Sequence, residues 1–177
     1  SNYFVLPNIG IGIIAAILSE EGHEVIIKDP ILEGMDFEDT VSFIIDNNID
    51  IVGLTTVSMH YEGAIQLARE VKKRRQSTIT ILGGPHFQGI GEECLEKNSF
   101  FDYICIGEGD YLISELINCD FNIDSFSSIS GLVYRDASGK VVSNGMGVTA
   151  DLDKLPLLHV GVSYFTPLPG TSSWGHF

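Results

Sequence analysis

The stretch "TITILGGPHF" (residues 78–87) decides the fold class of this chain. Its alternating β-branched and apolar residues predict a strand that ends at two consecutive glycines, followed by proline and histidine. Adjacent glycines at the end of a strand indicate either a tight turn or the close approach of another group to the backbone. The stretch therefore predicts a buried strand whose carboxyl end has been kept free of side chains.

Strand-like and helix-like patterns alternate on both sides of this stretch. Short apolar runs predict five parallel strands, at 3–7, 23–29, 50–56, 78–84 and 102–108. Amphipathic stripes predict helices between them, at 37–45 (after an N-cap at Asp36), 61–71, 88–97 and 110–118. The alternation predicts an α/β fold with a flavodoxin-like (Rossmann-like), doubly wound, five-stranded parallel sheet.

The pattern changes after residue 120. Residues 131–144, "GLVYRDASGKVVSN", predict a C-terminal β-hairpin that turns at Asp136–Gly139. Residues 145–177 have no convincing periodicity and predict an extended tail that packs against something else. We expect three units: an α/β domain (1–120), a β-hairpin and linker extension (121–158), and a tail (159–177).

Composition excludes several functional classes. A formal net charge of −14 over 177 residues argues against a nucleic-acid partner. Five of the ten basic residues lie between 69 and 75, which we interpret as the solvated end of a helix. No apolar run is long enough for a membrane span, and no signal peptide is recognised. Three widely spaced cysteines are typical of a reduced, cytoplasmic protein, and the histidines predict no metal site.

Three adjacent predicted strands end in residues that leave room or offer hydroxyls. They are Thr55-Thr56, Gly83-Gly84 and Gly107-Glu108-Gly109. Ligands of open α/β sheets bind beyond the carboxyl ends of the strands, at the topological switch point. Taken together, the three strand ends favour a flat or extended ligand.

A dinucleotide is one candidate ligand, because Gly10 and Gly12 are reminiscent of a dinucleotide-binding loop. The third glycine of that fingerprint is replaced by Ala15, and the nearest acidic residue is Asp29. A P-loop is excluded, because no Gly-Lys-Ser/Thr follows, and "LPNIGIG" offers no hydroxyl for the FMN phosphate. A nucleotide-dependent oxidoreductase is therefore kept as one hypothesis, beside the two that are given below.

The order of six segments is more specific than any one of them. They are "GIGIIAAILSEEGHEVIIKD", "DIVGLTTVS", "ITILGGPH", "FDYICIGEGD", "SGLVYRDASGKVV" and "DLDKLPLL". In order and spacing they resemble, over residues 5–158, the cobalamin-binding domain that precedes the barrel of cobalamin-dependent radical S-adenosylmethionine (SAM) enzymes. The resemblance implies a flavodoxin-like domain that holds a corrinoid, often as a methyl carrier.

The resemblance also implies roles for single residues. Family members with a lower-face histidine carry Asp-x-His-x-x-Gly; here "VLPNIG" places Pro7 at the histidine position, and only Gly10 matches. Proline cannot ligate cobalt, so the resemblance implies a base-off cofactor without a histidine lower ligand. The nucleotide tail is expected at Thr55, Thr56 and Val57, in a slot at Gly83 and Gly84, and under a loop at Gly107, Glu108 and Gly109. His60 and His86 are candidate contacts to the corrin face and to a propionamide or phosphate, with ordinary polar loop residues as the alternative.

The cluster motif of the barrel is missing. The three cysteines do not form C-x-x-x-C-x-x-C, so S-adenosylmethionine and a [4Fe–4S] cluster are expected only in the parent enzyme. Residues 164–174 resemble a stretch near the end of such barrels, which implies a lost barrel or joined segments. We expect a cobalamin module of methyl-transfer type that works with a radical SAM barrel in cis or in trans. The alternative is a stand-alone corrinoid carrier or sensor, or a flavodoxin-like domain that binds no corrinoid.

Overall fold

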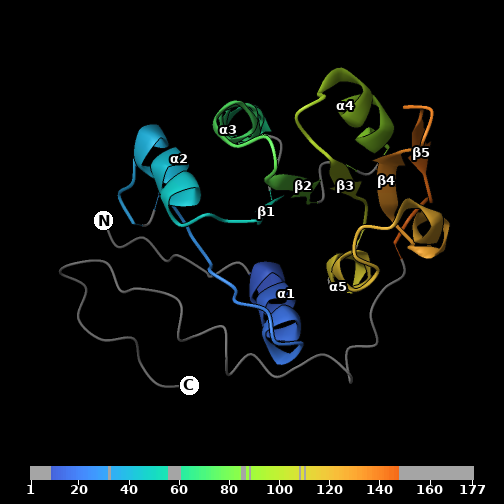
Figure 1. Cartoon of the computed structure of the whole chain (residues 1–177), viewed down its shortest axis with the longest axis horizontal. Helices are drawn as coiled ribbons and strands as arrows, with labels where there is room; N and C mark the ends of the chain where they lie inside the picture. The colour runs from blue at the N-terminus through green and yellow to red at the C-terminus, as the bar shows by residue number, and fades with distance from the viewer. Residues whose placement is uncertain are drawn as a thin grey trace, which may run out of the picture.

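The computed structural model describes residues 9–31, 33–55, 61–84, 87, 89–107, 109 and 111–147. Within them, five strands form one open sheet in the order β1-β2-β3-β4-β5 (Figure 1). The strands are β1 (Ile51–Thr55), β2 (Ile79–Gly83), β3 (Tyr103–Cys105), β4 (Leu132–Arg135) and β5 (Val141–Ser143). Strands β1, β2 and β3 run parallel, and the β3–β4 and β4–β5 pairs are antiparallel. The predicted flavodoxin-like α/β fold is confirmed.

Helices cover both faces of the sheet (Figure 1). On one side lie α2 (Phe37–Asp46), α3 (Tyr61–Arg74) and α4 (Gly91–Lys97). On the other lie α1 (Ile9–Glu20), α5 (Leu112–Asn118) and the 3₁₀ helix η3 (Ile123–Ser128). We call these sides the α3–α4 face and the α1–α5 face. The four predicted helices are confirmed, with ends that differ by a few residues.

The two-residue period of the strands divides the core between these faces. In β2, Leu82 packs with the residues of α3 and α4, whereas Ile81 packs with those of α5. In β3, Ile104 and Cys105 divide in the same way. Strands β2 and β3 are thus apolar on both sides, which is the pattern of a sheet covered on both faces.

The predicted strand at 23–29 is wrong for the described structure. These residues carry no strand pairing, and their side chains alternate between half-buried and exposed. In a flavodoxin-like strand order, the second strand pairs with the first. The predicted first strand, 3–7, lies outside the described residues, so the described sheet offers 23–29 no hydrogen-bonded neighbour. Because of this difference, the five described strands are three parallel strands and the hairpin.

The predicted hairpin is confirmed as β4 and β5, and it extends the sheet beyond β3. Asp136 fixes the turn: its carboxylate accepts hydrogen bonds from the backbone N–H groups of Ser138 (2.9 Å) and Lys140 (3.0 Å). Gly139 closes the turn with a φ of 84°, a conformation that suits glycine. The hairpin therefore shares the core of the α/β domain.

The cluster of basic residues lies at the end of α3, as predicted, but it is paired. Lys72 contacts Asp102 at 2.6 Å, and Arg75 contacts Asp50 at 3.0 Å. The remaining three cations, Arg69, Lys73 and Arg74, lie over the Phe100 ring or against Glu70 and Glu38. These contacts tie α3 to its neighbours.

In the described part of the chain, no helix is long and apolar enough to cross a membrane.

Candidate functional site

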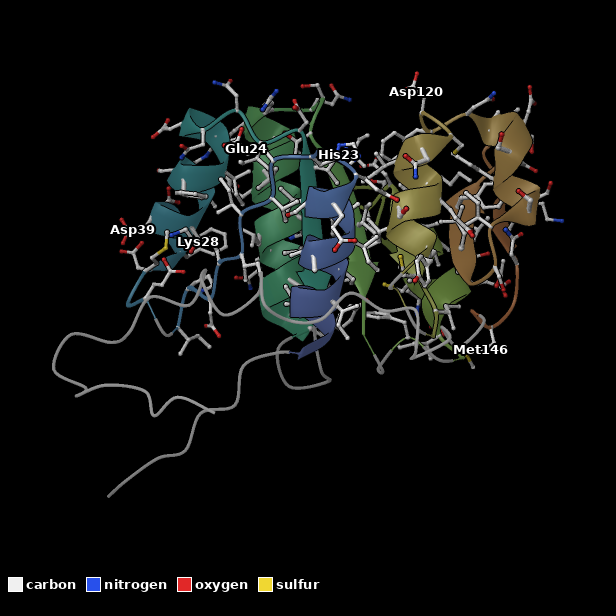
Figure 2. The ribbon with its side chains drawn as sticks, turned by 90° about the horizontal axis from the view of Figure 1, so that it is seen from below. His23, Glu24, Lys28, Asp39, Asp120 and Met146 are labelled. Atoms are coloured by element: carbon white, nitrogen blue, oxygen red, sulfur yellow. The ribbon has the colours of Figure 1, made fainter. Side chains whose placement is uncertain are left out.

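The carboxyl ends of the three parallel strands meet at one edge of the sheet. Thr55, the last residue of β1, pairs with Gly83, the last residue of β2. Cys105 ends β3 beside them, with Gly107 two residues beyond. We call this edge the carboxyl edge; in Figure 2 it is the side on which Met146 lies, opposite Asp120. The predicted strand ends therefore come together.

On the α1–α5 face, the carboxyl ends of β1 and β2 carry almost no side chains. Val52 packs against α2 and α3, so its neighbour Gly53 faces the opposite side, towards α1. A Cβ at Gly53 would have no heavy atom within 4 Å, and one at Gly83 would meet only Cys105, at 3.6 Å from its Cβ. Thr55, on the same face, is exposed. We call Gly53, Thr55 and Gly83 the glycine floor.

Among the described residues, those that border the glycine floor are apolar or neutral. Ile51, Ile79 and Ile81 continue the same face of β1 and β2. The Cys105 thiol is buried, and burial raises its pKa to about 12, so the thiol stays protonated at neutral pH. The floor therefore favours a flat, uncharged group, whose burial there leaves no charge unpaired.

Gly84, the second glycine of the Gly83-Gly84 pair, is required for a different reason. Gly84 has a φ of 123°, a conformation that side chains of L-residues rarely adopt. Its carbonyl accepts a hydrogen bond from the Phe87 backbone N–H at 3.3 Å. Gly84 is thus required by the turn that follows β2, whereas Gly83 leaves room on the face of the sheet.

Beyond β3, Gly107 and Gly131 leave room for another segment of the same chain. The Gly147 backbone N–H donates to the Ile106 carbonyl at 2.9 Å, and the Ile106 N–H donates to the Gly131 carbonyl at 2.8 Å. A Cβ at Gly131 would lie 2.5 Å from the Ile106 oxygen, and one at Gly107 would lie 3.1 Å from the Gly147 nitrogen. Residues 145–147 therefore lie against the end of β3, and Gly107 makes room for them.

The structure describes half of the predicted site residues. Gly10 lies exposed in the first turn of α1. Gly109 brings the loop after β3 to α1, because a Cβ there would lie 3.6 Å from the Ile14 side chain. Thr55, Gly83, Gly84 and Gly107 lie at the carboxyl edge. Six predicted residues lie outside the described ones: Pro7, Thr56, Val57, His60, His86 and Glu108.

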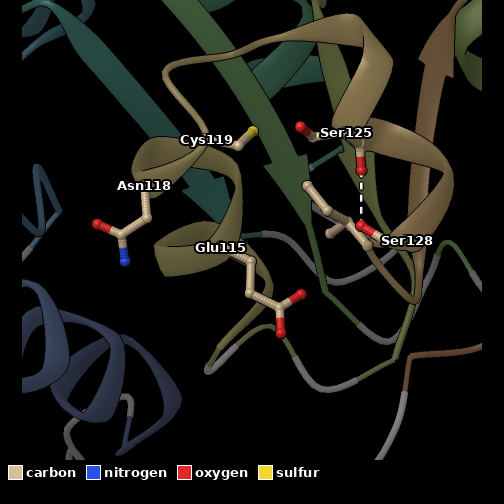
Figure 3. A pocket seen from close by; sticks show the side chains of 6 residues that line it. Glu115, Asn118, Cys119, Ser125 and Ser128 are labelled. Atoms are coloured by element: carbon tan, nitrogen blue, oxygen red, sulfur yellow. Dashed lines mark hydrogen bonds between the residues drawn. The ribbon is translucent and has the colours of Figure 1, made fainter.

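A separate hollow of about 520 Å³ lies between α5 and η3 (Figure 3). It is lined by Glu115, Asn118, Cys119, Ser125, Ser128 and Ile129. The Ser128 hydroxyl donates to the Ser125 carbonyl at 2.7 Å within η3. The lining residues belong to the second half of α5 and to the chain that follows it, and α5 runs away from the carboxyl edge, so this hollow is not part of the site.

Sequence reasoning missed two parts of the edge. The sequence pattern predicts Gly53 only as one residue of an apolar strand, although a glycine inside a strand indicates close approach to the backbone. It predicts residues 145–147 as part of the tail, because their contact with Ile106 is long-range and no local pattern indicates it.

Comparison with known proteins gives a family and two relatives. Residues 2–117 match the family described as the B12 binding domain. The chain is 29% identical over 135 residues to an uncharacterized methyltransferase, PH0819, of Pyrococcus horikoshii; the match covers 76% of this chain and 29% of that protein. It is 26% identical over 154 residues to cytidylyl-2-hydroxyethylphosphonate methyltransferase of Streptomyces wedmorensis, covering 75% of this chain and 28% of that protein.

Two solved structures share the fold. The cobalamin-dependent SAM radical enzyme OxsB, with aqua-cobalamin and S-adenosylmethionine bound, superposes with a TM-score of 0.73 at 21% identity, over 85% of this chain and 21% of OxsB. The radical SAM methyltransferase TsrM from Kitasatospora setae, with cobalamin and a [4Fe–4S] cluster bound, has a TM-score of 0.65 at 17% identity, over 84% and 28%. The chain spans less than a third of the length of each of these proteins.

Proposed function

The chain belongs to the B12-binding domain family, and we propose that it holds cobalamin base-off, with the nucleotide tail over the glycine floor and no histidine below the cobalt. It serves as the cobalamin module of a larger radical SAM enzyme of methyl-transfer type. The open space above Gly53 on the α1–α5 face is the observation that carries this proposal.

The glycine floor fits the tail of a corrinoid in shape and in charge. A flat aromatic base needs a broad, shallow surface, which two strands offer only where they lack side chains, as at Gly53 and Gly83. The neutral thiol of Cys105 and the apolar side chain of Ile81 border that surface. Burial of an aromatic ring against such a lining would supply much of the affinity.

Two further residues belong to the proposed site. Thr55, which is exposed at the rim of the floor, is proposed to hydrogen-bond a polar group of the tail through its hydroxyl. Gly84, with its positive φ of 123°, is proposed to keep this rim free of a side chain. Thr56, Val57, His60 and His86 are proposed to complete the contacts around the corrin ring.

The lower face of the cobalt is proposed to lack a protein ligand. Pro7 stands where the family's histidine motif carries its ligand, and a proline ring has no free nitrogen in a peptide. When bound, cobalamin supplies a cobalt centre that carries a methyl group. The contribution of this chain is to bind the tail, exclude water from it and orient the ring above the carboxyl edge.

A titration with hydroxocobalamin, followed by desalting, tests binding. We expect the protein to retain the corrinoid, and the reduced cob(II)alamin form to show an electron paramagnetic resonance spectrum without nitrogen splitting. Pro7→His is the matched variant: an imidazole at this position should introduce nitrogen splitting. Loss of the corrinoid on desalting, or nitrogen splitting in the wild-type spectrum, would contradict the proposed binding mode.

The role as a module rests on the length comparison, because the relatives extend far beyond the matched region. The reading frame of the gene tests it. A C-x-x-x-C-x-x-C motif encoded in the same frame would support a barrel in cis, and one in an adjacent gene a barrel in trans. A gene that encodes this domain alone, without such a neighbour, would favour a stand-alone carrier instead.

A further inference from the structure

Tyr61 links the start of α3 to the chain that follows β2. It is the first residue of α3 and directly follows segment 56–60, which continues from β1. Its ring meets the Phe87 ring edge-on, with 5.8 Å between the centroids. Phe87 is fully buried and lies three residues after Gly84, to whose carbonyl its backbone N–H donates. The two rings therefore connect the chain beyond β1 to the chain beyond β2.

The Tyr61 hydroxyl is held by a small polar cluster inside the α3–α4 core. It lies 3.0 Å from the Cys94 sulfur, and the Asn98 side-chain amide donates to it at 3.3 Å. The same Asn98 amide also donates to the Cys94 carbonyl at 2.8 Å. Asn98 donates to the phenol oxygen, and either the phenol or the Cys94 thiol can be the donor in the contact between them. Both partners belong to α4 or its C-terminal cap.

The cluster keeps one protonation state across the physiological range. Burial and the Cys94 hydrogen bond raise the pKa of Tyr61 to about 12, and burial raises the pKa of the Cys94 thiol. Both groups therefore remain neutral, and the hydrogen bonds do not change with pH near neutrality. Such a cluster serves as a fixed support and not as a switch.

We propose that Tyr61 is a positioning residue of the cobalamin site, holding the start of α3 against Phe87 and Cys94 so that the loops after β1 and β2 keep the spacing the cofactor requires. This inference rests on the proposed function. It adds a support beneath the site, on the face of the sheet opposite the glycine floor. We therefore expect that removal of the Tyr61 hydroxyl weakens cobalamin binding although the glycine floor is unchanged.

The test compares Tyr61→Phe with Tyr103→Phe. Tyr103 is half-buried at the start of β3, stacks with Phe121 and lies at the other end of the strand from the carboxyl edge. We expect Tyr61→Phe to weaken hydroxocobalamin binding about fivefold, the effect of one typical hydrogen bond, whereas Tyr103→Phe leaves affinity unchanged. Equal affinity in wild type and Tyr61→Phe would overturn the proposal, as would an equal loss in both variants.

Cys94 provides a rescue experiment. Cys94→Ala removes the sulfur that the phenol contacts and should weaken binding, whereas Cys94→Ser keeps a hydrogen-bonding atom and should restore most of it. In the double variant Tyr61→Phe with Cys94→Ala, the second change should add little, because both changes break one contact. Full additivity would show that the two residues act separately and would overturn the proposal.

Amide hydrogen exchange without cofactor separates this proposal from the proposed function. We expect the Phe87 and Ile90 amides, which donate to the Gly84 and Phe87 carbonyls, to exchange faster in Tyr61→Phe than in Tyr103→Phe. If the wild-type chain does not retain cobalamin, the proposed function fails, and the exchange rates still test the support. Unchanged exchange in Tyr61→Phe would overturn the support in either case.

Discussion

The two faces of strand β2 differ sharply at its carboxyl end. On the α3–α4 face, Leu82 is fully buried among residues of both helices. On the α1–α5 face, the next residue is Gly83, which faces the same side as Gly53 on the neighbouring strand. One face is filled by buried apolar side chains, whereas the other ends in backbone.

This difference separates stability from binding. Close packing on the α3–α4 face contributes to the free energy of folding, and removing atoms there leaves a cavity. Removing side chains from the α1–α5 face forgoes that contribution and leaves a surface on which a ligand can lie. Apart from Tyr61 and Cys94, whose contacts are proposed to position the site, substitutions on the α3–α4 face should therefore change mainly stability, whereas substitutions in the glycine floor should change mainly cobalamin affinity.

The largest expected change in stability is that of Leu82→Ala. Truncation of a fully buried leucine should lower the free energy of unfolding by about 3 kcal/mol, measured by urea unfolding. Cobalamin affinity of the folded protein should remain near the wild-type value, because Leu82 faces away from the glycine floor. Leu82→Met, which conserves volume, is the control and should cost much less. A large loss of affinity in Leu82→Ala would break the proposed division between the faces.

A smaller effect is expected at Gly131, where the chain crosses the end of β3. In Gly131→Ala the new Cβ would lie 2.5 Å from the Ile106 oxygen, at a φ of 80°. We expect a loss of about 2 kcal/mol in urea unfolding. Gly139→Ala is the matched control, because it has a similar φ of 84° but no heavy atom within 4 Å of its Cβ. Equal losses of unfolding free energy in the two variants would show that backbone strain alone causes the loss and that the close contact of Gly131 with Ile106 contributes nothing.

The last expected effect, which is absent at neutral pH, is a dependence of stability on alkaline pH. The pKa of Cys105 is raised by burial to about 12 in the folded protein, above its ordinary value of 9.0. The folded state therefore holds this proton more tightly, so its contribution is complete below about pH 9 and is lost as the pH rises towards 12. Tyr61 and Tyr103, each raised to about 12, act in the same direction.

Urea midpoints between pH 8 and pH 11 test this expectation. The midpoint should fall with pH in the wild type and fall less steeply in Cys105→Ala, which has no thiol to ionise. Parallel curves for the two proteins would contradict a buried, neutral thiol beside the glycine floor.

Local patterns were sufficient for most of the fold. The stripe of Ile65, Ala68 and Val71 predicted α3, and Asp36 predicted the start of α2, where it forms a capping box with Asp39. The turn at Asp136–Gly139 predicted the hairpin, because its residues favour a tight turn regardless of the rest of the chain. In each case the physical cause lies within a few residues.

Long-range contacts were beyond such patterns. The role of Gly107 in a loop over the ligand stays a prediction; the described residues place Gly147 against Gly107, and nothing near Gly107 in the sequence indicates that partner. The position of Gly53 on the α1–α5 face also depends on a long-range contact, because Val52 packs against α2 and α3 and its neighbour must face the other side. The strand predicted at 23–29 failed for the same reason, since a strand needs a neighbour as well as a pattern.

The most direct test of the glycine floor is the cobalamin affinity of Gly53→Val, compared with Gly63→Val. Both glycines have open space around a new Cβ, but Gly63 lies on the exposed surface of α3. Valine suits a strand, so Gly53→Val should fold with unchanged or higher stability. We predict that Gly53→Val loses about 100-fold in hydroxocobalamin affinity, whereas Gly63→Val keeps that of the wild type. Wild-type affinity in a folded Gly53→Val protein would contradict the placement of the nucleotide tail over the floor.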